Sequence, residues 1–354
     1  MFAALAMMLS TALPAEAAAA AVWVVVYADQ ETQGVSYKPA SQTASRAGIS
    51  ATVSRHGTGS YTVSVANASS PGLPVVTAVN NAGVHCQLSW YYQDDDGTTE
   101  IIEVACYTGA TLTDSEFTLA FFTSTPPDGG GTGAYGYVHD DRPDMADHTP
   151  ARSYNSTGGA VKIYHTAGTS IWTVRFFGQA FNNTAGNVQV SAVGTTPMRC
   201  AVYQWYPVPE VRAVDAQVRC DRLANPGYTP QWTLAYTHDR SIVGGTSGFY
   251  GYLQANDPAA PAYTPMLPRN RAPETYTHTV SRSGPGQYQA QIYGPLKELV
   301  AVHVSVNGNT DSFCNLRNWT VTPNAQPAAR VNLTCYNANG VPADNWFSLN
   351  YYSP

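Results

Sequence analysis

Charged residues are scarce in this sequence, and their scarcity limits the partners that the protein can have. Asp, Glu, Lys and Arg together make up 12% of the 354 residues, about half the usual share. Lysine occurs only at Lys38, Lys162 and Lys297, and the net charge is −6. No stretch gathers Lys and Arg into a patch that could neutralise phosphates. We therefore expect no nucleic-acid partner.

Runs of Lys, Glu, Leu and Ala, which favour long helices, are also missing after residue 21. The chain instead has 29 Gly, 24 Pro and 23 Tyr residues, together with many Val and Thr. Val, Thr and Tyr fit the pleated, half-buried surface of a strand, and Gly and Pro mark turns. The composition therefore predicts an all-β fold.

Only the amino terminus carries a continuous apolar run. This run breaks at Pro14, and Ala15-Glu16-Ala17 follows it with a small-residue cleavage pattern, although a basic segment before the run is missing. We interpret residues 1–21 as a signal peptide and the mature protein as secreted and extracellular. No later stretch is long and apolar enough to cross a bilayer, so we expect no transmembrane segment.

An internal repeat organises the rest of the chain. Three segments end alike and lie 115 residues apart: Phe117–Phe121, Trp232–Tyr236 and Phe347–Tyr351. A Trp follows the first cysteine of each unit by four or five residues, at Trp90, Trp205 and Trp319. We place the repeats at 22–124, 133–238 and 248–354. Repeats of this length are too long for propeller blades or solenoid turns.

Each repeat shows six to eight short segments with period-two alternation and turn residues between them. This pattern predicts three tandem β-sandwich or jelly-roll-like domains. The links Pro126–Gly131 and Gly244–Ser247 are rich in turn residues. We expect them to be short flexible connectors, with the domains arranged as beads on a string.

The six cysteines keep the same spacing as the repeat. Cys86, Cys200 and Cys314 lie 114 residues apart, and a second cysteine follows each of them 20 or 21 residues later. Structural zinc and redox sites use closer pairs such as C-x-x-C, and the chain has none. In a secreted protein the pattern predicts three disulfides within the repeats: Cys86–Cys106, Cys200–Cys220 and Cys314–Cys335.

The repeat resembles a tandem domain of about 110 residues found in uncharacterised secreted proteins of bacteria, with one Cys pair in each copy. The second repeat carries the resemblance most fully, in Asn155–Gly159, Gly186–Val190, Val218-Arg-Cys220 and Trp232–Tyr236. In the third repeat Val300–Val304 stands where the Gly-Asn strand is expected. The resemblance implies a β-rich fold and export, and it implies no activity.

The sequence contains no recognisable catalytic motif. G-x-S-x-G and H-E-x-x-H are absent, and no pair of acidic residues recurs in all three repeats. We therefore expect no cofactor and no enzymatic activity.

One polar segment stands out against this background. His139–His148 contains four carboxylates and two imidazoles, which are groups that can hold a divalent cation. The matching loops, Asp29–Glu31 and Asn256–Pro258, do not repeat the cluster, and no standard ligand spacing is met. A solvated loop is the favoured interpretation, and a metal site stays open as the alternative.

Tyrosines that occur in pairs are the remaining candidates for a binding site. Sugar-binding β-domains use aromatic ring faces, although a shared face of tyrosines is more often core. Neighbouring residues in a strand point to opposite faces, so two adjacent tyrosines cannot both be buried in a regular strand. The candidate ligand-binding residues are Tyr91, Tyr92, Tyr135, Tyr137, Tyr250 and Tyr252.

Three functions compete at this point. The favoured hypothesis is a secreted, non-enzymatic binding or adhesion protein for a polysaccharide or another cell-surface component, with three weak sites on a flexible chain that gain by avidity. A ligand-free structural spacer of the cell surface is the second hypothesis. A secreted hydrolase with its site in the second repeat, near His139–His148, is the third.

Overall fold

The computed structural model describes most of the chain after the amino-terminal segment. The described ranges are 22–44, 48–68, 72–123, 133–165, 168–178, 181, 185–222, 230–244, 248–266, 269–272, 276–298, 301–308 and 311–353. The expected signal peptide at 1–21 and the link Pro126–Gly131 lie outside the described residues.

The described chain is built almost entirely of strands, which confirms the all-β prediction. The first repeat contributes β1 (Trp23–Ala28), β2 (Ser41–Ala44), β3 (Ser50–Gly57), β4 (Ser60–Ala66), β5 (Gly72–Val79), β6 (His85–Gln93), β7 (Glu100–Thr108), β8 (Thr111–Leu112) and β9 (Glu116–Thr123). The second contributes β10 (Ala134–Asp140), β11 (Asp147–His148), β12 (Arg152–Asn155), β13 (Val161–His165), β14 (Ile171–Phe177), β15 (Asn187–Val193), β16 (Met198–Val208), the 3₁₀ turn η2 (Pro209–Val211), β17 (Ala213–Arg222) and β18 (Gln231–His238).

The third repeat contains the remaining nine strands. They are β19 (Phe249–Ala255), β20 (Ala262–Tyr263), β21 (Asn270–Arg271), β22 (Thr279–Gly284), β23 (Gln287–Ile292), β24 (Ala301–Asn307), β25 (Phe313–Val321), β26 (Ala329–Tyr336) and β27 (Trp346–Ser353). Each repeat is a sandwich of an inner layer and an outer layer. In the first repeat the inner layer has the order β2-β1-β9-β5 and the outer layer the order β6-β7-β4-β3.

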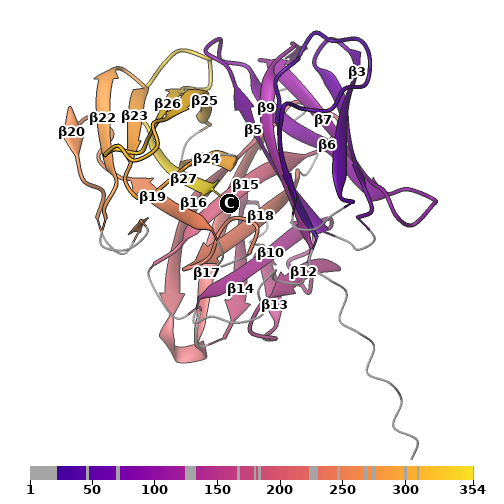
Figure 1. Cartoon of the computed structure of the whole chain (residues 1–354). Coiled ribbons are helices and arrows are strands. Elements are labelled where there is room, and N and C mark those ends of the chain that lie inside the picture. Colours follow the sequence, from indigo (N-terminus) through magenta and orange to yellow (C-terminus); the bar gives the residue numbers. More distant parts are fainter. Residues whose placement is uncertain are drawn as a thin grey trace, which may run out of the picture.

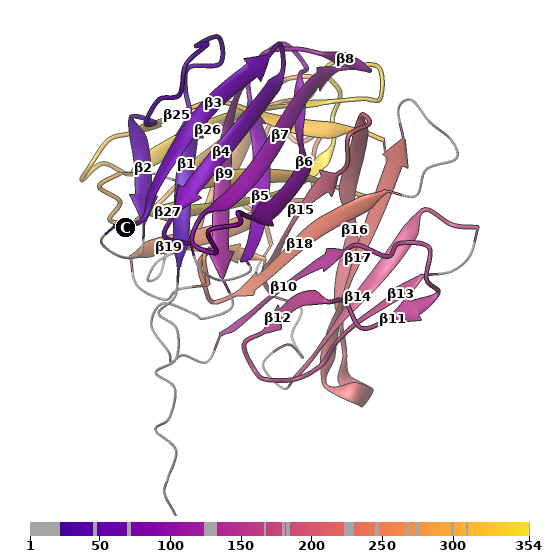
Figure 2. The same cartoon turned by 90° about the vertical axis from the view of Figure 1, so that its right-hand side faces the viewer.

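The three repeats form a closed ring, because each sheet runs from one repeat into another. The inner layer of the first repeat continues into the outer layer of the third repeat. In the same way, the inner layer of the second repeat continues into the outer layer of the first, and the inner layer of the third continues into the outer layer of the second. The junctions are short parallel pairings at Val79–Leu316, Val193–Leu88 and Asn307–Val202. Figure 1 looks onto the ring, with the repeats around a common centre, and Figure 2 shows it from the side.

This closure corrects the expectation of beads on a string. Independent domains would have separate sheets, whereas here each sheet contains strands of two repeats. The segment directly before the second link is also packed into the molecule, since Ile242 and Val243 are buried in an apolar cluster with Trp23, Tyr135 and Tyr352. That cluster contains residues of all three repeats. The ring is therefore a single packed body rather than a flexible chain of domains.

Side-chain hydroxyls fasten the junctions near the centre of the ring. Thr77, Ser191 and Ser305 lie 114 residues apart in the sequence. Ser191 accepts a hydrogen bond from the Val76 N–H at 3.0 Å, and Ser305 accepts one from the Val190 N–H at 3.0 Å. Thr77 makes the third of these contacts, because it accepts a hydrogen bond from the Val304 N–H at 3.3 Å. Each repeat thus satisfies a buried backbone donor of another repeat.

A glycine and an aspartate hold a tight hairpin in the first and third repeats, at Gly59-Ser-Tyr61 and Gly286-Gln-Tyr288. Gly59 has a φ of +66°, and its N–H donates to Asp114 at 2.8 Å. The Tyr61 hydroxyl donates to the same carboxylate at 3.1 Å, and Arg55 pairs with it at 2.8 Å. The third repeat has the same arrangement around Asp344. A side chain at Gly59 would meet the carbonyl oxygen of Cys106, so the tight hairpin requires glycine.

Candidate functional site

Each outer layer carries a row of hydrogen-bonding side chains that crosses three strands. The row occupies the same three positions in every repeat, as the strand register shows. We call these rows the outer-face rows. They consist of Thr62, Glu103 and Trp90 in the first repeat, Thr173, Gln217 and Gln204 in the second, and Gln289, Asn332 and Asn318 in the third.

Hydrogen bonds link all members of the second and third rows and two members of the first. In the second repeat Gln204 donates to Gln217 at 2.7 Å, and Gln217 donates to Thr173 at 3.1 Å. In the first repeat Thr62 donates to Glu103 at 3.2 Å, and Trp90 lies opposite Glu103.

The third row consists of amides alone. Asn332 donates to Asn318 at 2.7 Å, and Gln289 donates to Asn332 at 3.0 Å. An amide offers both donors and acceptors, so a row of amides can bind a ligand that also does both. These rows were not anticipated from the sequence, because Gln, Asn, Thr and Glu at matching positions do not form a recognisable motif.

Exposed aromatic rings extend two of the rows. Trp90 is 49% exposed and Tyr92, two residues further along β6, is 41% exposed. Tyr206, on β16, is 37% exposed. Since residues i and i+2 of a strand share a face, Trp90 and Tyr92 lie side by side on the outer surface of the first repeat.

Most of the tyrosines predicted to bind a ligand lie in the interior. Tyr91, Tyr135, Tyr137 and Tyr252 are at most 3% exposed, so the prediction that they present ring faces to a ligand is wrong. Tyr250 is half-buried beside the apolar cluster at the centre of the ring. Of the six predicted residues only Tyr92 is exposed, because inward-facing positions of β10 and β19 pack against other repeats rather than facing solvent.

Trp90 does not occupy the strand position of the other two tryptophans, because it follows its cysteine by four residues rather than five. The register shifts between Leu88 and Trp90, and the same shift occurs in β16 and β25. Tyr91 rather than Trp90 therefore occupies the position of Trp205, which is buried. Both rings contact an arginine of another repeat: Arg152 lies 4.7 Å from the centre of Tyr91 and Arg269 lies 4.2 Å from that of Trp205.

A cavity of about 60 Å³ lies where the three repeats meet. We call it the axial cavity. It is lined by corresponding residues of the three repeats, including Thr77, Ser191 and Ser305 and the disulfide-bonded Cys86, Cys200 and Cys314. The disulfides Cys86–Cys106, Cys200–Cys220 and Cys314–Cys335 are all present, which confirms the predicted pairing.

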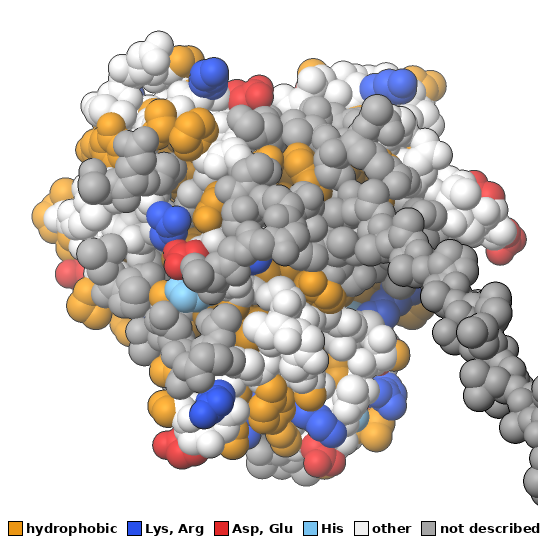
Figure 3. All heavy atoms as spheres, turned by 60° about the horizontal axis from the view of Figure 1, so that its bottom comes forward, with side chains coloured by type: hydrophobic (Ala, Val, Ile, Leu, Met, Phe, Trp, Pro, Cys, Tyr) orange, Lys and Arg blue, Asp and Glu red, His pale blue; other side chains and the backbone are white. Residues whose placement is uncertain are grey.

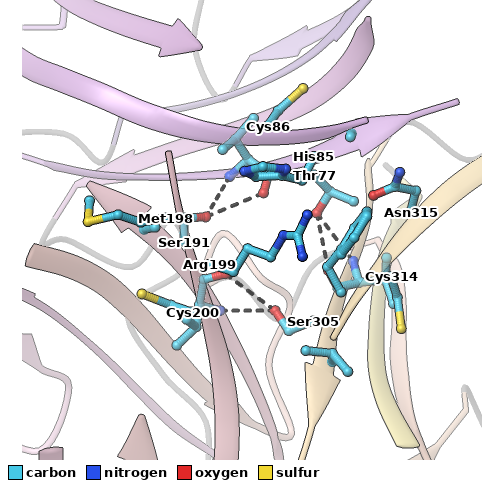
Figure 4. A pocket seen from close by; sticks show the side chains of 17 residues that line it. Thr77, His85, Cys86, Ser191, Met198, Arg199, Cys200, Ser305, Cys314 and Asn315 are labelled. Atoms are coloured by element: carbon cyan, nitrogen blue, oxygen red, sulfur yellow. Dashed lines mark hydrogen bonds between the residues drawn. The ribbon is translucent and has the colours of Figure 1, made fainter. Parts of the chain in front are cut away.

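Three residues that precede these cysteines give the axial cavity its chemistry. They are His85, Arg199 and Phe313, each at most 6% exposed. Figure 4 shows the Arg199 side chain reaching into the centre of the cavity toward His85. Its guanidinium carbon lies 4.1 Å from the centre of the Phe313 ring, and His85 lies 5.7 Å from the same ring. Burial lowers the pKa of Arg199 to about 10.

The segment His139–His148 does not form a converging cluster. His139 faces Tyr91 of the first repeat, with the two ring centres 5.1 Å apart. Asp140, the next residue, points the other way and lies 3.1 Å from the Nε2 atom of His148. Burial raises the pKa of Asp140 to about 7 and lowers that of His148. Within the described residues no group of three potential metal ligands gathers here or elsewhere.

Comparison with protein-family models, with curated proteins and with solved structures finds no match to this chain. The resemblance to tandem domains of secreted bacterial proteins therefore stays a prediction. In the described part of the chain no helix has the length and apolar character needed to cross a membrane.

Proposed function

We propose that the protein is a secreted, non-enzymatic binding protein that holds a polyhydroxylated polymer, such as a cell-surface polysaccharide, on its outer faces. The observation that carries this proposal is the outer-face row, which recurs at the same three strand positions in all three repeats. The residues of the row differ between repeats, but their capacity to form hydrogen bonds is the same. This supports a role of the outer layer in binding a ligand through hydrogen bonds. Hydroxyls of a sugar both donate and accept, as the side chains of the rows do.

The charge of the surface agrees with a neutral ligand. Two of the three rows contain no charged residue, and on the face drawn in Figure 3 the Lys and Arg side chains do not gather into one patch. Trp90 and Tyr92 add flat apolar surface beside polar groups, and such aromatic rings are suited to the apolar faces of sugar rings. An anionic polymer would instead favour clustered Lys and Arg.

The rigid ring changes how three sites would act together. In Figure 1 the outer layers, marked by β3 and β7, by β13 and β14, and by β22 and β23, lie on different sides of the ring. Sites that point in different directions cannot all bind one flat surface at once. Each site would instead bind a separate polymer strand, and the avidity expected of a flexible chain would not arise. The protein would then cross-link polymer chains.

The proposal is tested with the mature chain, residues 22–354, on cellulose, chitin, peptidoglycan and a glycan array. We expect binding to at least one polymer. In the triple variant Trp90→Ala, Gln217→Ala, Asn332→Ala we expect affinity to fall about tenfold or more, because a buried aromatic anchor alone is worth that much at an interface. A matched control is Trp346→Ala, since Trp346 is 46% exposed but lies on β27, outside the rows.

Two results would contradict the proposal. The first is an absence of binding to every polymer, which would favour the structural spacer. The second is equal binding by the triple variant and the wild type, which would place the site elsewhere. Release of soluble sugars from any of these polymers would favour the hydrolase instead. Export is tested separately, by the amino-terminal sequence of the protein recovered from culture medium, which we expect to begin near residue 22.

A further inference from the structure

The axial cavity holds a buried positive charge that has no direct ionic partner. Arg199 is 6% exposed, and among the described residues no carboxylate oxygen lies within 4.0 Å of its guanidinium. Its hydrogen bonds go to backbone carbonyls, at 2.9 Å to Ala338 and 3.5 Å to Asp311, and its Nε has no partner within the described chain. A guanidinium in such a place is costly unless a negative charge approaches it.

The acidic side chains near Arg199 form their ion pairs with a different arginine. Asp311 accepts a hydrogen bond from Arg219 at 2.8 Å, and Asp221 accepts one from Arg219 at 3.1 Å. Asp221 lies directly across the strand pair from Arg199, yet it contacts Arg219 instead. The Asp311 carboxylate still acts on Arg199 through space. The Arg199 Nε is left without an acceptor within the described chain.

His85 adds a second polar ring to the same cavity. It is 5% exposed, and within the described residues its ring interacts with the backbone of Tyr107 without a hydrogen bond of good geometry. Burial and the neighbouring Arg199 charge lower its pKa to about 3, so the ring is neutral and carries one N–H. The other polar groups of the lining are occupied: Ser191 bonds to Val76, and the Asn315 amide donates to Val84 at 2.6 Å.

We propose that the axial cavity binds one small oxyanion, of the size of a carboxylate or phosphate, between the Arg199 guanidinium and the His85 ring. The volume of about 60 Å³ exceeds what a single water molecule needs and suits a group of a few heavy atoms. The guanidinium repels cations and offers the planar donor geometry that oxyanions fit. Because residues of all three repeats line the cavity, an anion there joins the repeats at their centre.

The first test asks whether the protein, as purified, carries an anion or takes one up. The mature chain is dialysed into a buffer of a bulky sulfonate, whose anion is too large for the cavity. It is then unfolded, and the released anions are measured by ion chromatography. In parallel, the melting temperature is followed against added phosphate, acetate or chloride at constant ionic strength. We expect either about one oxyanion released per chain or a saturable rise in melting temperature with phosphate or acetate.

The second test assigns the effect to the cavity. Arg199→Met removes the charge and keeps much of the bulk, and His85→Phe copies the residue found in the third repeat. We expect Arg199→Met to weaken the response to the oxyanion at least about tenfold and to release none on unfolding. His85→Phe keeps the guanidinium and weakens the response less. Arg330→Met, at an exposed arginine on β26, controls for the loss of one positive charge and keeps the response.

Several results would overturn the inference. They are a wild-type protein that neither releases an oxyanion nor responds to one, an Arg199→Met variant that responds like the wild type, or a response to chloride that equals the response to oxyanions. If Arg199→Met does not fold, Arg199→Lys and the release measurement on the wild type decide the question. Polymer binding is a separate assay, so failure of the proposed function leaves this test intact.

Discussion

The hydroxyl of Ser191 bonds to both backbone groups of Val76, a residue 115 positions away in the sequence. It accepts from the N–H at 3.0 Å and donates to the carbonyl oxygen at 3.3 Å. Val76 belongs to the first repeat and Ser191 to the second, so one side chain connects two sandwiches at the point where their sheets join.

Ser191→Ala tests how much this connection stabilises the ring. The substitution leaves a buried backbone donor without its partner, and we expect the free energy of unfolding to fall by about 1–3 kcal/mol. Urea unfolding followed by tryptophan fluorescence measures the change. Ser283→Ala, at an exposed serine near the end of β22, serves as the control and is expected to change the free energy by less than about 0.5 kcal/mol. An equal effect of both substitutions would contradict the role of the junction.

A single repeat should not fold by itself. The fragment 133–238 would lose the partners of β15 and β16 at both junctions and would expose Tyr135 and Tyr137, which are buried in the intact ring. Unpaired strand edges and apolar patches favour aggregation. We expect the fragment to be aggregated or poorly ordered by size-exclusion chromatography and circular dichroism. A soluble monomer with a cooperative thermal transition would show that the repeats are independent after all.

The sequence was sufficient for the repeat, the strands and the disulfides, because each leaves a regular mark. Strands leave period-two alternation, and the cysteines recur every 114 residues. Ring closure has almost no recognisable pattern in the sequence. The residues that signal it are Thr77, Ser191 and Ser305, which look like ordinary strand residues. The tyrosine prediction failed for a related reason, since a face turned toward another repeat carries the same apolar pattern as a core.

The axial cavity was equally hard to foresee. His85, Arg199 and Phe313 share one position in the repeat, directly before the first cysteine. Their chemistries differ, so no motif marks the position, and only closure of the ring brings them together. The spacing of four residues from Cys86 to Trp90, against five in the other two repeats, places Trp90 one strand position earlier and turns it outward.

Removing one disulfide should weaken the ring without changing its fold. Cys200–Cys220 closes a loop with a sequence separation of 20, for which loop entropy gives a stabilisation of about 3 kcal/mol. In the double variant Cys200→Ala, Cys220→Ala we expect a loss of that size in urea unfolding, with an unchanged circular dichroism spectrum. The double variant at Cys86 and Cys106 should lose a similar amount, since its separation is also 20. A loss of stability in only one of the two double variants would argue against an equal stabilising role of the two disulfides.

Glu100 provides a pH-dependent contribution whose sign can be worked out. Its side chain is 1% exposed, and within the described residues neither carboxyl oxygen has a hydrogen-bond partner. Burial raises its pKa to about 7, although the charge of Arg152 opposes the rise. The folded chain therefore holds this proton more tightly than the unfolded chain does. The contribution of Glu100 to stability is present in full below its ordinary pKa near 4.5 and is lost as the pH rises through about 7.

Glu100→Gln should remove that loss, because the amide stays neutral at every pH. We expect the variant to be more stable than the wild type by about 3 kcal/mol at pH 8, with the difference shrinking to nearly zero at pH 4. Urea unfolding at the two pH values measures it, and Glu210→Gln, at an exposed residue of η2, controls for the general loss of a negative charge. Since acid also protonates buried histidines in both proteins, only the difference between variant and wild type carries the information. A difference that is the same at both pH values would mean that Glu100 does not change its ionisation over this range.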